Sequence, residues 1–344
     1  MRQFRSPFGI YRQLLPALLC LTVLLFSLAC SAGDSTLTVY SGRSQTLVHP
    51  LLEQFIDESG LDVQVKYASS PAIAGTLLEE GKNSPADVVF LQDPGSLGNL
   101  AEAGLLAELP SDILDKVDLG YKSQTGQWVG TSGRARTVVY NTSAVNPQTE
   151  LPRSILDFTD TRWANRIGWA PTNGSFQAFL TAFRLEWGEE AARNWLEGIQ
   201  ANSPRLYPNN VSIVDAVARG EVDVGLVNHY YAEQFIQEEG LEFGARNHFI
   251  GGGDPGALVL VAGAGIVSYT DNRGAAEQLV RYLLSDTAQR YFAQNTREYP
   301  LVDGVQPGGE LPPLDSLDPP EVDLGALTDA RGTVSLLRET GILP

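Results

Sequence analysis

Cysteine, histidine and methionine are scarce in this sequence, with two, three and one residues among 344. Cys20 lies inside an apolar N-terminal run, so a mature chain would keep at most one cysteine and cannot build a disulfide framework. No pair of histidines has the spacing of zinc ligands, which argues against a metal centre of that type.

Basic residues and catalytic motifs are also lacking. The chain has 24 Lys and Arg against 41 Asp and Glu, for a formal net charge of −17. This balance argues against nucleic acid as a partner and against a polybasic membrane patch. The sequence has no Gly-x-Ser-x-Gly elbow, no phosphate-binding P-loop and no GxGxxG after the first expected strand. We therefore expect that the protein is not an enzyme.

The N-terminus has the pattern of an export signal. Arginines precede an almost uninterrupted apolar run, residues 14–29, which is short for a membrane span and ends in small residues. Cys30 follows directly, where a lipoprotein signal carries the cysteine that is acylated, although Ser27 replaces the usual aliphatic residue. Cleavage near Ala32 by an ordinary signal peptidase is the alternative. We expect residues 1–29 to be a signal peptide and the protein to be exported, either periplasmic or anchored outside the cytoplasm through Cys30.

From residue 35 onward, strand patterns alternate with helix patterns, and 344 residues suffice for two domains. Three consecutive strand–helix units imply a parallel sheet with right-handed crossovers, so the fold class is α/β. Strands at residues 133–140 and 257–267 are expected to cross between domains, and the proline- and glycine-rich residues 303–320 to form a surface connection. The other expected strands are 37–40, 61–67, 86–91, 166–170 and 222–227, and the expected helices are 47–59, 71–81, 95–103, 176–187, 211–218, 232–240, 273–284, 286–294 and 332–341.

Two adjacent tyrosines follow the apolar strand at residues 222–227. Asn228, His229, Tyr230 and Tyr231 come at its carboxyl end, immediately before an expected helix. Ligands of open α/β sheets bind beyond the carboxyl ends of strands, so the two phenols are candidate ligand atoms. The alternative is an aromatic pair that only packs against the start of the helix.

Short motifs follow one another in order along the chain, at residues 39–43, 85–89, 103–106, 132–136, 138–140, 167–168, 194–196, 220–222, 228–231, 254–258 and 298–301. This ordered series covers nearly the whole mature chain. It resembles the bacterial ferric-iron-binding proteins of ABC importers, the transferrin-like branch of the periplasmic substrate-binding proteins.

The resemblance implies a two-lobed periplasmic-binding-protein fold of type II, in which each lobe is a mixed, mostly parallel sheet flanked by helices. Crossover strands would form the hinge between residues 35–134 with 262–312, the first lobe, and residues 135–261 with 313–344, the second. It also implies that ferric iron binds with a synergistic anion, carbonate or phosphate, in the cleft between the lobes. An ABC permease would receive the iron from a monomer that touches the membrane only through its lipid anchor.

The resemblance assigns Tyr230 and Tyr231 as iron ligands. Ferric ion is a hard acid that suits oxygen donors, and a nearby trivalent ion favours loss of the phenol protons. This sequence departs from the family at two positions: Ser44 stands where many members have a histidine ligand, and Gln92 where they have a glutamate. Two phenolates cannot fill an octahedral shell, so an anion, water or a neutral oxygen such as that of Gln92 would have to complete it.

A candidate anion site lies at residues 171–175, at an expected helix start where free N–H groups and the helix dipole favour an oxyanion. Simple N-capping is the plainer role for its asparagine and for Asn210. Two arginines in turns near the expected cleft could grip an oxyanion, or could instead form salt bridges. The predicted anion-binding residues are Asn173, Gly174, Ser175, Asn210, Asn228, Arg43 and Arg134.

The missing histidine and glutamate leave a second interpretation open. The same fold hosts binders of organic solutes, such as a phosphonate or thiamine. A phosphonate would use the helix start at residues 171–175 without iron.

Overall fold

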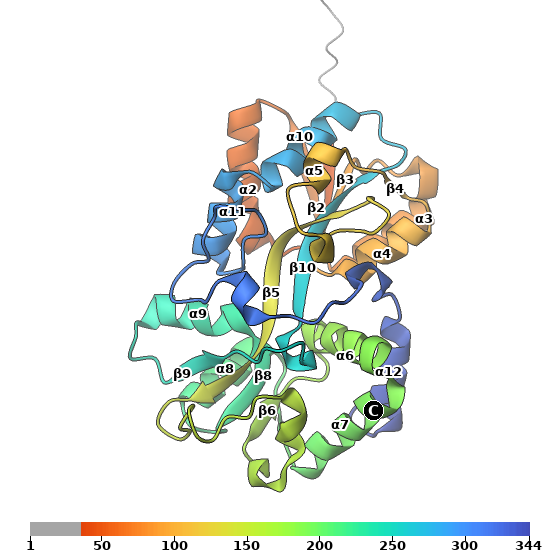
Figure 1. The fold of residues 1–344 in the computed structure, drawn as a ribbon. Coiled ribbons are helices and arrows are strands. Elements are labelled where there is room, and N and C mark those ends of the chain that lie inside the picture. Colours follow the sequence, from red (N-terminus) through yellow and green to blue (C-terminus); the bar gives the residue numbers. More distant parts are fainter. Residues whose placement is uncertain (1–35) are drawn as a thin grey trace, which may run out of the picture. The chain divides into compact units, whose positions relative to one another are not determined.

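The computed structural model describes residues 36–344, and Leu37–Pro344 form one compact unit (Figure 1). The expected signal peptide, residues 1–29, and Cys30 lie outside the described residues. Within the described part of the chain, no helix combines the length and apolar character needed to cross a bilayer.

Ten strands form one continuous mixed sheet in the described unit, with the path β2-β1-β3-β10-β5-β8-β6-β7; β4 also pairs with β10, and β9 with β5. β1 pairs in parallel with β2 and β3, which confirms the parallel arrangement predicted for the first three strands. We call the half built around β1–β3 the first lobe and the half built around β6–β8 the second lobe. The strands are β1 (Leu37–Ser41), β2 (Val63–Tyr67), β3 (Val88–Leu91), β4 (Leu106–Ala107), β5 (Val129–Asn141), β6 (Ile167–Trp169), β7 (Arg205–Leu206), β8 (Val224–Asn228), β9 (Ala245–His248) and β10 (Val259–Val267).

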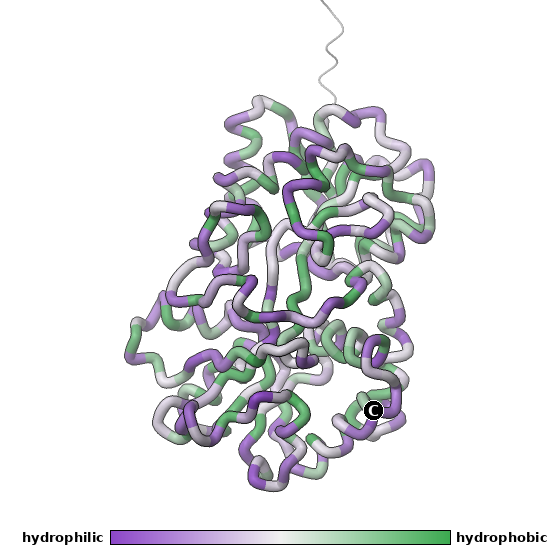
Figure 2. Tube along the Cα trace, viewed as in Figure 1, coloured by the Kyte–Doolittle hydropathy of each residue, from purple (hydrophilic) through white to green (hydrophobic). Residues whose placement is uncertain are grey.

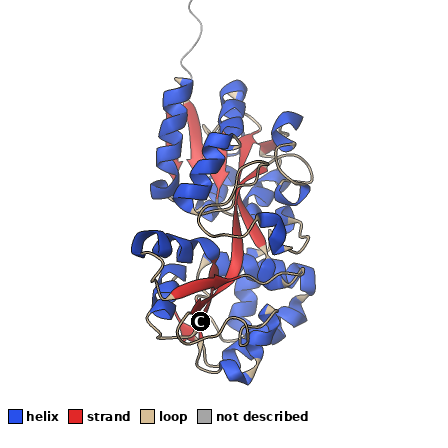
Figure 3. Cartoon of the chain, turned by 60° about the vertical axis from the view of Figure 1, so that its left-hand side comes forward, coloured by secondary structure: helices blue, strands red, loops and turns tan. Residues whose placement is uncertain are grey.

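The two long strands β5 and β10 connect the lobes (Figures 1 and 3). β5 pairs with β10 as far as Ala135, and from Arg136 onward it pairs with β8 and β9. The prediction of crossing strands is therefore confirmed. β5 begins at Val129, four residues before the predicted start, because its glycines and hydroxyl residues hide the strand pattern. A Cβ at Gly130 would lie 2.6 Å from the Tyr121 carbonyl oxygen, so this strand needs glycine there.

The helices cover the sheet much as the apolar spacing predicts. α2, for example, buries Val48, Leu51, Leu52 and Phe55 and ends at Gly60, whose φ of 68° is left-handed. α7 was not predicted, although it buries Trp195 on one face. The main helices are α2 (Gln45–Ser59), α3 (Ser70–Glu80), α4 (Pro94–Glu102), α5 (Ser111–Leu114), α6 (Gly174–Trp187), α7 (Glu189–Ala201), α8 (Asn210–Ala218), α9 (His229–Glu239), α10 (Arg273–Leu283), α11 (Asp286–Tyr291) and α12 (Ala330–Glu339).

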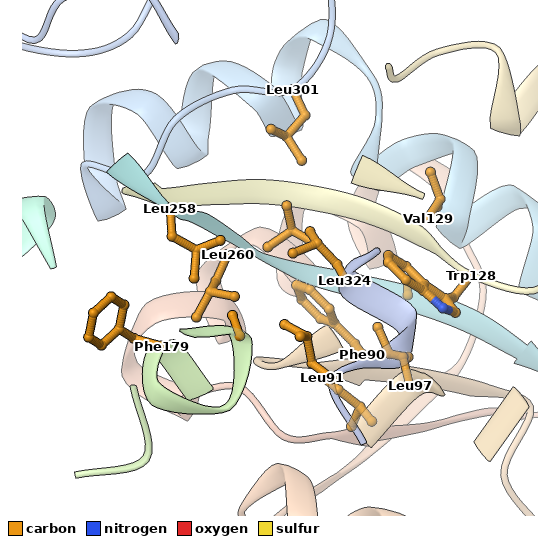
Figure 4. Close-up of a cluster of buried hydrophobic side chains, with 14 of the residues drawn as sticks. Phe90, Leu91, Leu97, Trp128, Val129, Phe179, Leu258, Leu260, Leu301 and Leu324 are labelled. Carbon is orange, nitrogen blue, oxygen red and sulfur yellow. The ribbon is translucent and has the colours of Figure 1, made fainter. Parts of the chain in front are cut away.

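The largest hydrophobic core follows the central strands. All nine residues of β10 are buried, and much of this strand is coloured as hydrophobic in Figure 2. Figure 4 shows Phe90 of β3, Leu97 of α4, Val129 of β5 and Leu260 of β10 gathered in one cluster. Burial of apolar area at this junction holds β5 and β10 in place where they enter the first lobe.

The C-terminal segment contacts both lobes. The short 3-10 helix Leu324–Ala326 packs on α4 so closely that a Cβ at Gly98 would lie 2.0 Å from the Gly325 carbonyl oxygen. α12 then packs on α6, where the hydroxyls of Thr181 and Thr333 are 2.7 Å apart (Figure 1). The sequence pattern predicted this last helix but not the surface that it covers.

Candidate functional site

The paired tyrosines lie in the first turn of α9, immediately after β8. Their ring centroids are 4.1 Å apart, with an interplanar angle of 32°. Tyr230 is only 3% exposed, whereas Tyr231 is partly exposed and lines a cavity of about 330 Å³. The two rings thus pack against each other, and at least one phenol also faces an open space where a ligand could bind.

This cavity lies between residues of the first and second lobes. On the first-lobe side it is lined by Gln92 after β3 and by the starts of α3 and α4. On the second-lobe side it is lined by the start of α6 and by Tyr231, and Arg134 of β5 adds a cation. The structure therefore brings six of the predicted site residues to one cavity: Gln92, Arg134, Asn173, Gly174, Ser175 and Tyr231.

Hydrogen bonds join the predicted anion-binding asparagines into one network. The Asn173 side-chain oxygen accepts hydrogen bonds from the Ser175 N–H at 3.0 Å and the Ser175 hydroxyl at 2.6 Å. The Asn210 amide donates to Asn173 Oδ1 at 3.1 Å, and Asn210 Oδ1 accepts from the Asn228 N–H at 3.3 Å. Asn173 is indeed the N-cap of α6, but Asn209, not Asn210, caps α8. Capping alone therefore does not explain why Asn210 points at the start of α6.

Arg134 is buried beside the cavity, with 2% of its surface exposed. Its guanidinium donates hydrogen bonds to the carbonyl oxygens of Gln92 and Val261, but its Nε has no partner within residues 36–344. Burial lowers the pKa of Arg134, while the nearby Tyr230 and Glu298 raise it. A buried guanidinium with a free donor favours an anion close by.

Arg43 and Ser44 lie away from this cavity lining. Arg43 forms a buried salt bridge to Glu298 at 2.7 Å, with side chains 0% and 1% exposed. This is the alternative that the sequence left open for Arg43, although the pair is buried and not on the surface. Ser44 is exposed, and its hydroxyl lies 2.9 Å from the Thr46 hydroxyl.

Arg136 is a site residue that the sequence analysis missed. It is 5% exposed, donates to the Asn228 side-chain oxygen at 3.0 Å and lies 5.0 Å from the centre of the Phe179 ring. Burial lowers its pKa to about 10, and the phenols of Tyr231 and Tyr230 oppose that shift. Residues two apart on a strand share a face, so the prediction for Arg134 could have been extended to Arg136 from the sequence alone.

His229 has a structural role at the start of α9. Its Nδ1 accepts a hydrogen bond from the Ala135 N–H at 3.1 Å, so Nε2 carries the proton and donates to the Arg297 carbonyl at 2.9 Å. Burial lowers the pKa of His229 to about 4. The neutral ring thus anchors the turn that presents the two tyrosines and has no nitrogen free for a ligand.

The electrostatic environment keeps Tyr230 protonated when no cation is bound. Burial raises the pKa of Tyr230 well above its usual value, the neighbouring Tyr231 adds to this, and Arg134 partly opposes it. In residues 36–344 no group of three or more His, Cys, Asp and Glu could hold a metal ion. A metal in this cavity would therefore depend on phenol oxygens, on the side-chain oxygens of Gln92 and Asp93 in the lining, and on donors that arrive with it.

Comparison with known proteins places the chain in a family. Residues 83–318 match the family of bacterial extracellular solute-binding proteins, and the chain belongs to this family. Its members bind substrates for transport, which confirms the expectation that the protein is not an enzyme.

Individual relatives are similar over most of their length. The chain is 33% identical to the major ferric iron-binding protein of Neisseria meningitidis serogroup B over 320 residues, which are 91% of this chain and 95% of that protein. It matches the structure of iron-bound HitA from Pseudomonas aeruginosa with a TM-score of 0.81 and 35% identity, covering 89% of this chain and 99% of that chain. A Trichodesmium protein, IdiA or FutA, solved with iron and citrate, matches with a TM-score of 0.77 and 26% identity over 89% of this chain and 99% of that chain. These likenesses confirm the resemblance and the two-lobed fold of type II.

Proposed function

We propose that this protein captures ferric iron outside the cytoplasm and delivers it to an ABC permease. The observation that carries the proposal is the closely packed pair Tyr230–Tyr231 beside a cavity between the lobes, with Arg134 and Arg136 buried next to it. Ferric-binding names among the relatives support iron as the cargo. The phenolates would be the ligands, because a hard trivalent cation stabilises them in their deprotonated form.

A synergistic anion, carbonate or phosphate, would complete the iron shell from the second lobe. Asn173 accepts hydrogen bonds from the N–H groups of Ser175, Phe176 and Gln177, and the dipole of the 14-residue helix α6 favours negative charge at this end. Asn210 and Asn228 would hold the network that shapes this anion site. Gln92, on the opposite wall, would offer a neutral oxygen in place of the glutamate expected from the family.

Hinge closure would then trap the iron. β5 and β10 are the crossover strands, so bending near Ala135 would bring the second lobe, residues 135–261 with 313–344, against residues 35–134 with 262–312. We further propose that the mature protein is a monomer and that a lipid on Cys30 anchors it outside the cytoplasm.

The proposal is tested by mixing the iron-free protein with ferric ion and either bicarbonate or phosphate. Charge transfer from phenolate to ferric iron should give a visible absorption band. A mixture that stays colourless with every anion would refute iron as the cargo. A rise in melting temperature with a phosphonate and without iron would then support the organic-solute alternative, which the neutral Gln92 and exposed Ser44 favour.

Iron binding should weaken as the pH falls. Burial raises the pKa of Tyr230, so the iron-free protein holds this proton at neutral pH and iron must displace it. More protons in solution favour the iron-free form, and we expect the visible band to disappear below about pH 5. Absorbance measured across a pH series checks this, and a band that persists unchanged to pH 4 would argue against phenolate ligands.

Arg136→Gln should weaken ferric binding by about tenfold, because an opposite charge close to an ionising group shifts its pKa by one unit or more. The guanidinium lies near both phenols, and its loss makes their phenolates less stable. Arg136→Lys, which keeps the positive charge, should recover part of the affinity. Titration of iron into each variant at constant pH gives the comparison, and equal affinities for wild type and Arg136→Gln would exclude this role.

A further inference from the structure

His229 lies where the crossover strand β5 passes between the lobes. It is the first residue of α9, directly before the tyrosine pair, and it is fully buried. Its ring accepts a hydrogen bond from the N–H of Ala135, the last residue of β5 that pairs with β10 before the strand turns to β8. On its other side the ring donates to the Arg297 carbonyl at 2.9 Å and packs on Tyr299, with ring centroids 4.7 Å apart. One side chain thus joins the tyrosine turn to the crossover strand and to a turn from the C-terminal part of the chain.

The turn that receives this hydrogen bond is fixed to the first lobe. Its Glu298 forms the buried ion pair with Arg43, which follows β1. Tyr299 exchanges two backbone hydrogen bonds with Gly133 of β5, at 2.8 and 2.9 Å. Arg297 has a left-handed backbone, with a φ of 60°, at the end of the π-helical turn that follows α11. A residue other than glycine keeps this conformation only where its surroundings hold it, so the Arg297 carbonyl is a fixed acceptor.

Two further contacts tie α9 to the same turn. Gln234 donates to the Thr296 carbonyl at 3.3 Å, and Arg297 Nε donates to the Gln237 side-chain oxygen at 2.9 Å. α9 follows β8 and so begins in the second lobe, yet these polar contacts reach a turn that is bound to the first lobe. The helix that carries the tyrosines is therefore held from both lobes.

This arrangement bears on iron capture because metal ligands bind best when other groups fix their position. Partners that orient a metal ligand typically contribute 10- to 100-fold in metal affinity, on the order of that of a weak ligand. Gln92 and Arg134 line the cavity from the first-lobe side and from β5. A tyrosine turn that is fixed to the first lobe keeps its phenols in a set position relative to these two residues before iron arrives.

We propose that His229 is a positioning residue for iron capture, whose hydrogen bond to Arg297 fixes Tyr230 and Tyr231 relative to the first-lobe wall of the cavity. The tyrosines are the ligands, and His229 acts through them without touching the iron. Loss of this bond leaves the tyrosine turn free to move, and iron binding must then also order it. This inference rests on the proposed capture of ferric iron and adds the residue that preorganises the site.

Two substitutions separate the two hydrogen bonds of the ring. His229→Asn keeps an oxygen near the position of Nδ1, which can accept from Ala135, and loses the bond to Arg297. His229→Gln keeps an amide donor near the position of Nε2, which can bond to Arg297. We expect His229→Asn to raise the Kd for ferric iron at constant bicarbonate by about tenfold, and His229→Gln to recover part of that affinity. At saturating iron both variants should show the wild-type visible band, because both phenolates remain.

His248→Asn is the matched control. His248 is a partly buried residue of β9, outside the cavity lining, and its Nε2 donates to the Pro152 carbonyl at 2.9 Å. This substitution also removes a hydrogen bond between a histidine ring and a carbonyl. It should lower the melting temperature about as much as His229→Asn does, but it should leave the Kd for iron unchanged. A purely structural role of His229 would give the same result for both variants.

The double variant Gln234→Met with Gln237→Met tests the same idea without changing the buried ring. Gln234 is partly exposed and Gln237 is exposed, and methionine is a good helix former, so this variant should fold. It removes the other two contacts between α9 and the turn, and the Kd for iron should again rise. Wild-type Kd values in His229→Asn and in the double variant would overturn the positioning role and leave iron capture intact. If His229→Asn does not fold, the double variant decides alone. Absence of a coloured iron complex of the wild type with every anion would instead overturn the proposed function.

Discussion

Tyr231→Phe will weaken or abolish the visible band of the iron-loaded protein, because one of the two phenolates is lost. We expect iron binding to weaken by about 100-fold, since loss of a group that only supports a metal ligand already costs roughly 10- to 100-fold. The phenylalanine keeps the ring that packs on Tyr230, with centroids 4.1 Å apart, and removes only the oxygen. The fold should therefore be preserved while one phenolate is lost. Tyr231 is the tyrosine of the pair that lines the cavity.

Tyr230→Phe should have a comparable effect on iron binding. The Tyr230 phenol is buried, and burial raises its pKa. Replacing it with phenylalanine removes the cost of burying a hydroxyl, so this variant should unfold no more easily than the wild type. Tyr269→Phe is the matched control, because Tyr269 is 56% exposed and lies outside the cavity lining. Spectra and iron titrations of the three variants separate the outcomes. Wild-type colour in both Tyr230→Phe and Tyr231→Phe would mean that the pair only packs.

Glu298→Gln will lower the free energy of unfolding by about 3–5 kcal/mol, the usual effect of removing one partner of a buried ion pair. Arg43 donates to Glu298 at 2.7 Å, and its Nε and Nη1 have no partner within residues 36–344. Glu298 also accepts from the Ser132 hydroxyl at 2.8 Å. Glutamine keeps the shape but leaves the Arg43 charge buried without a counterion.

The same pair predicts a pH dependence of stability. Burial raises the pKa of Glu298. The charge and hydrogen bond of Arg43, together with Arg134 and Ser132, lower it by more, so the pKa of Glu298 lies below its usual value. A carboxyl with a depressed folded-state pKa stabilises fully above its unfolded-state pKa, and this contribution is lost as the pH falls through the folded-state value. Glu298→Gln should lack that acid-dependent loss.

Urea denaturation at several pH values measures both effects. Glu339→Gln breaks the exposed pair that Arg193 forms at 2.5 Å and should cost less than about 1 kcal/mol. The double variant Arg43→Met with Glu298→Leu removes both charges and should be more stable than Glu298→Gln alone. A loss for Glu298→Gln no larger than that for Glu339→Gln would show that the pair does not hold the structure together.

Local patterns predicted the secondary structure of the first lobe well and some of the second lobe poorly. Predicted strands and helices such as 37–40 and 47–59 agree with β1 and α2 to within two residues, because their apolar spacing and stop glycine act locally. α7 and β9 were missed, since α7 was seen only as a family motif and β9, Ala245–His248, has no apolar alternation. α11 ends at Tyr291, three residues early, where the helix widens into a π-helical turn over Phe292–Thr296.

Only part of the candidate site could be predicted from the sequence. The double tyrosine and the asparagine-rich helix start could be recognised from the sequence because each is a short run at the end of a strand. The sequence could not show whether Arg43 reaches the cavity, because its partner Glu298 lies 255 residues away along the chain. The starts of α3 and α4 likewise face the cavity only after the sheet has formed.

The sequence by itself predicted an export signal, and it determined the α/β pattern, the crossing strands and the family, because these depend on local hydrophobicity, turn residues and short motifs. Only the tertiary structure decided which cations face the cavity, which are buried in ion pairs, where α12 packs, and that three helix starts meet around one space. The physical reason is that burial and long-range pairing set the charge state and reach of a side chain. Both depend on contacts between residues far apart in the chain.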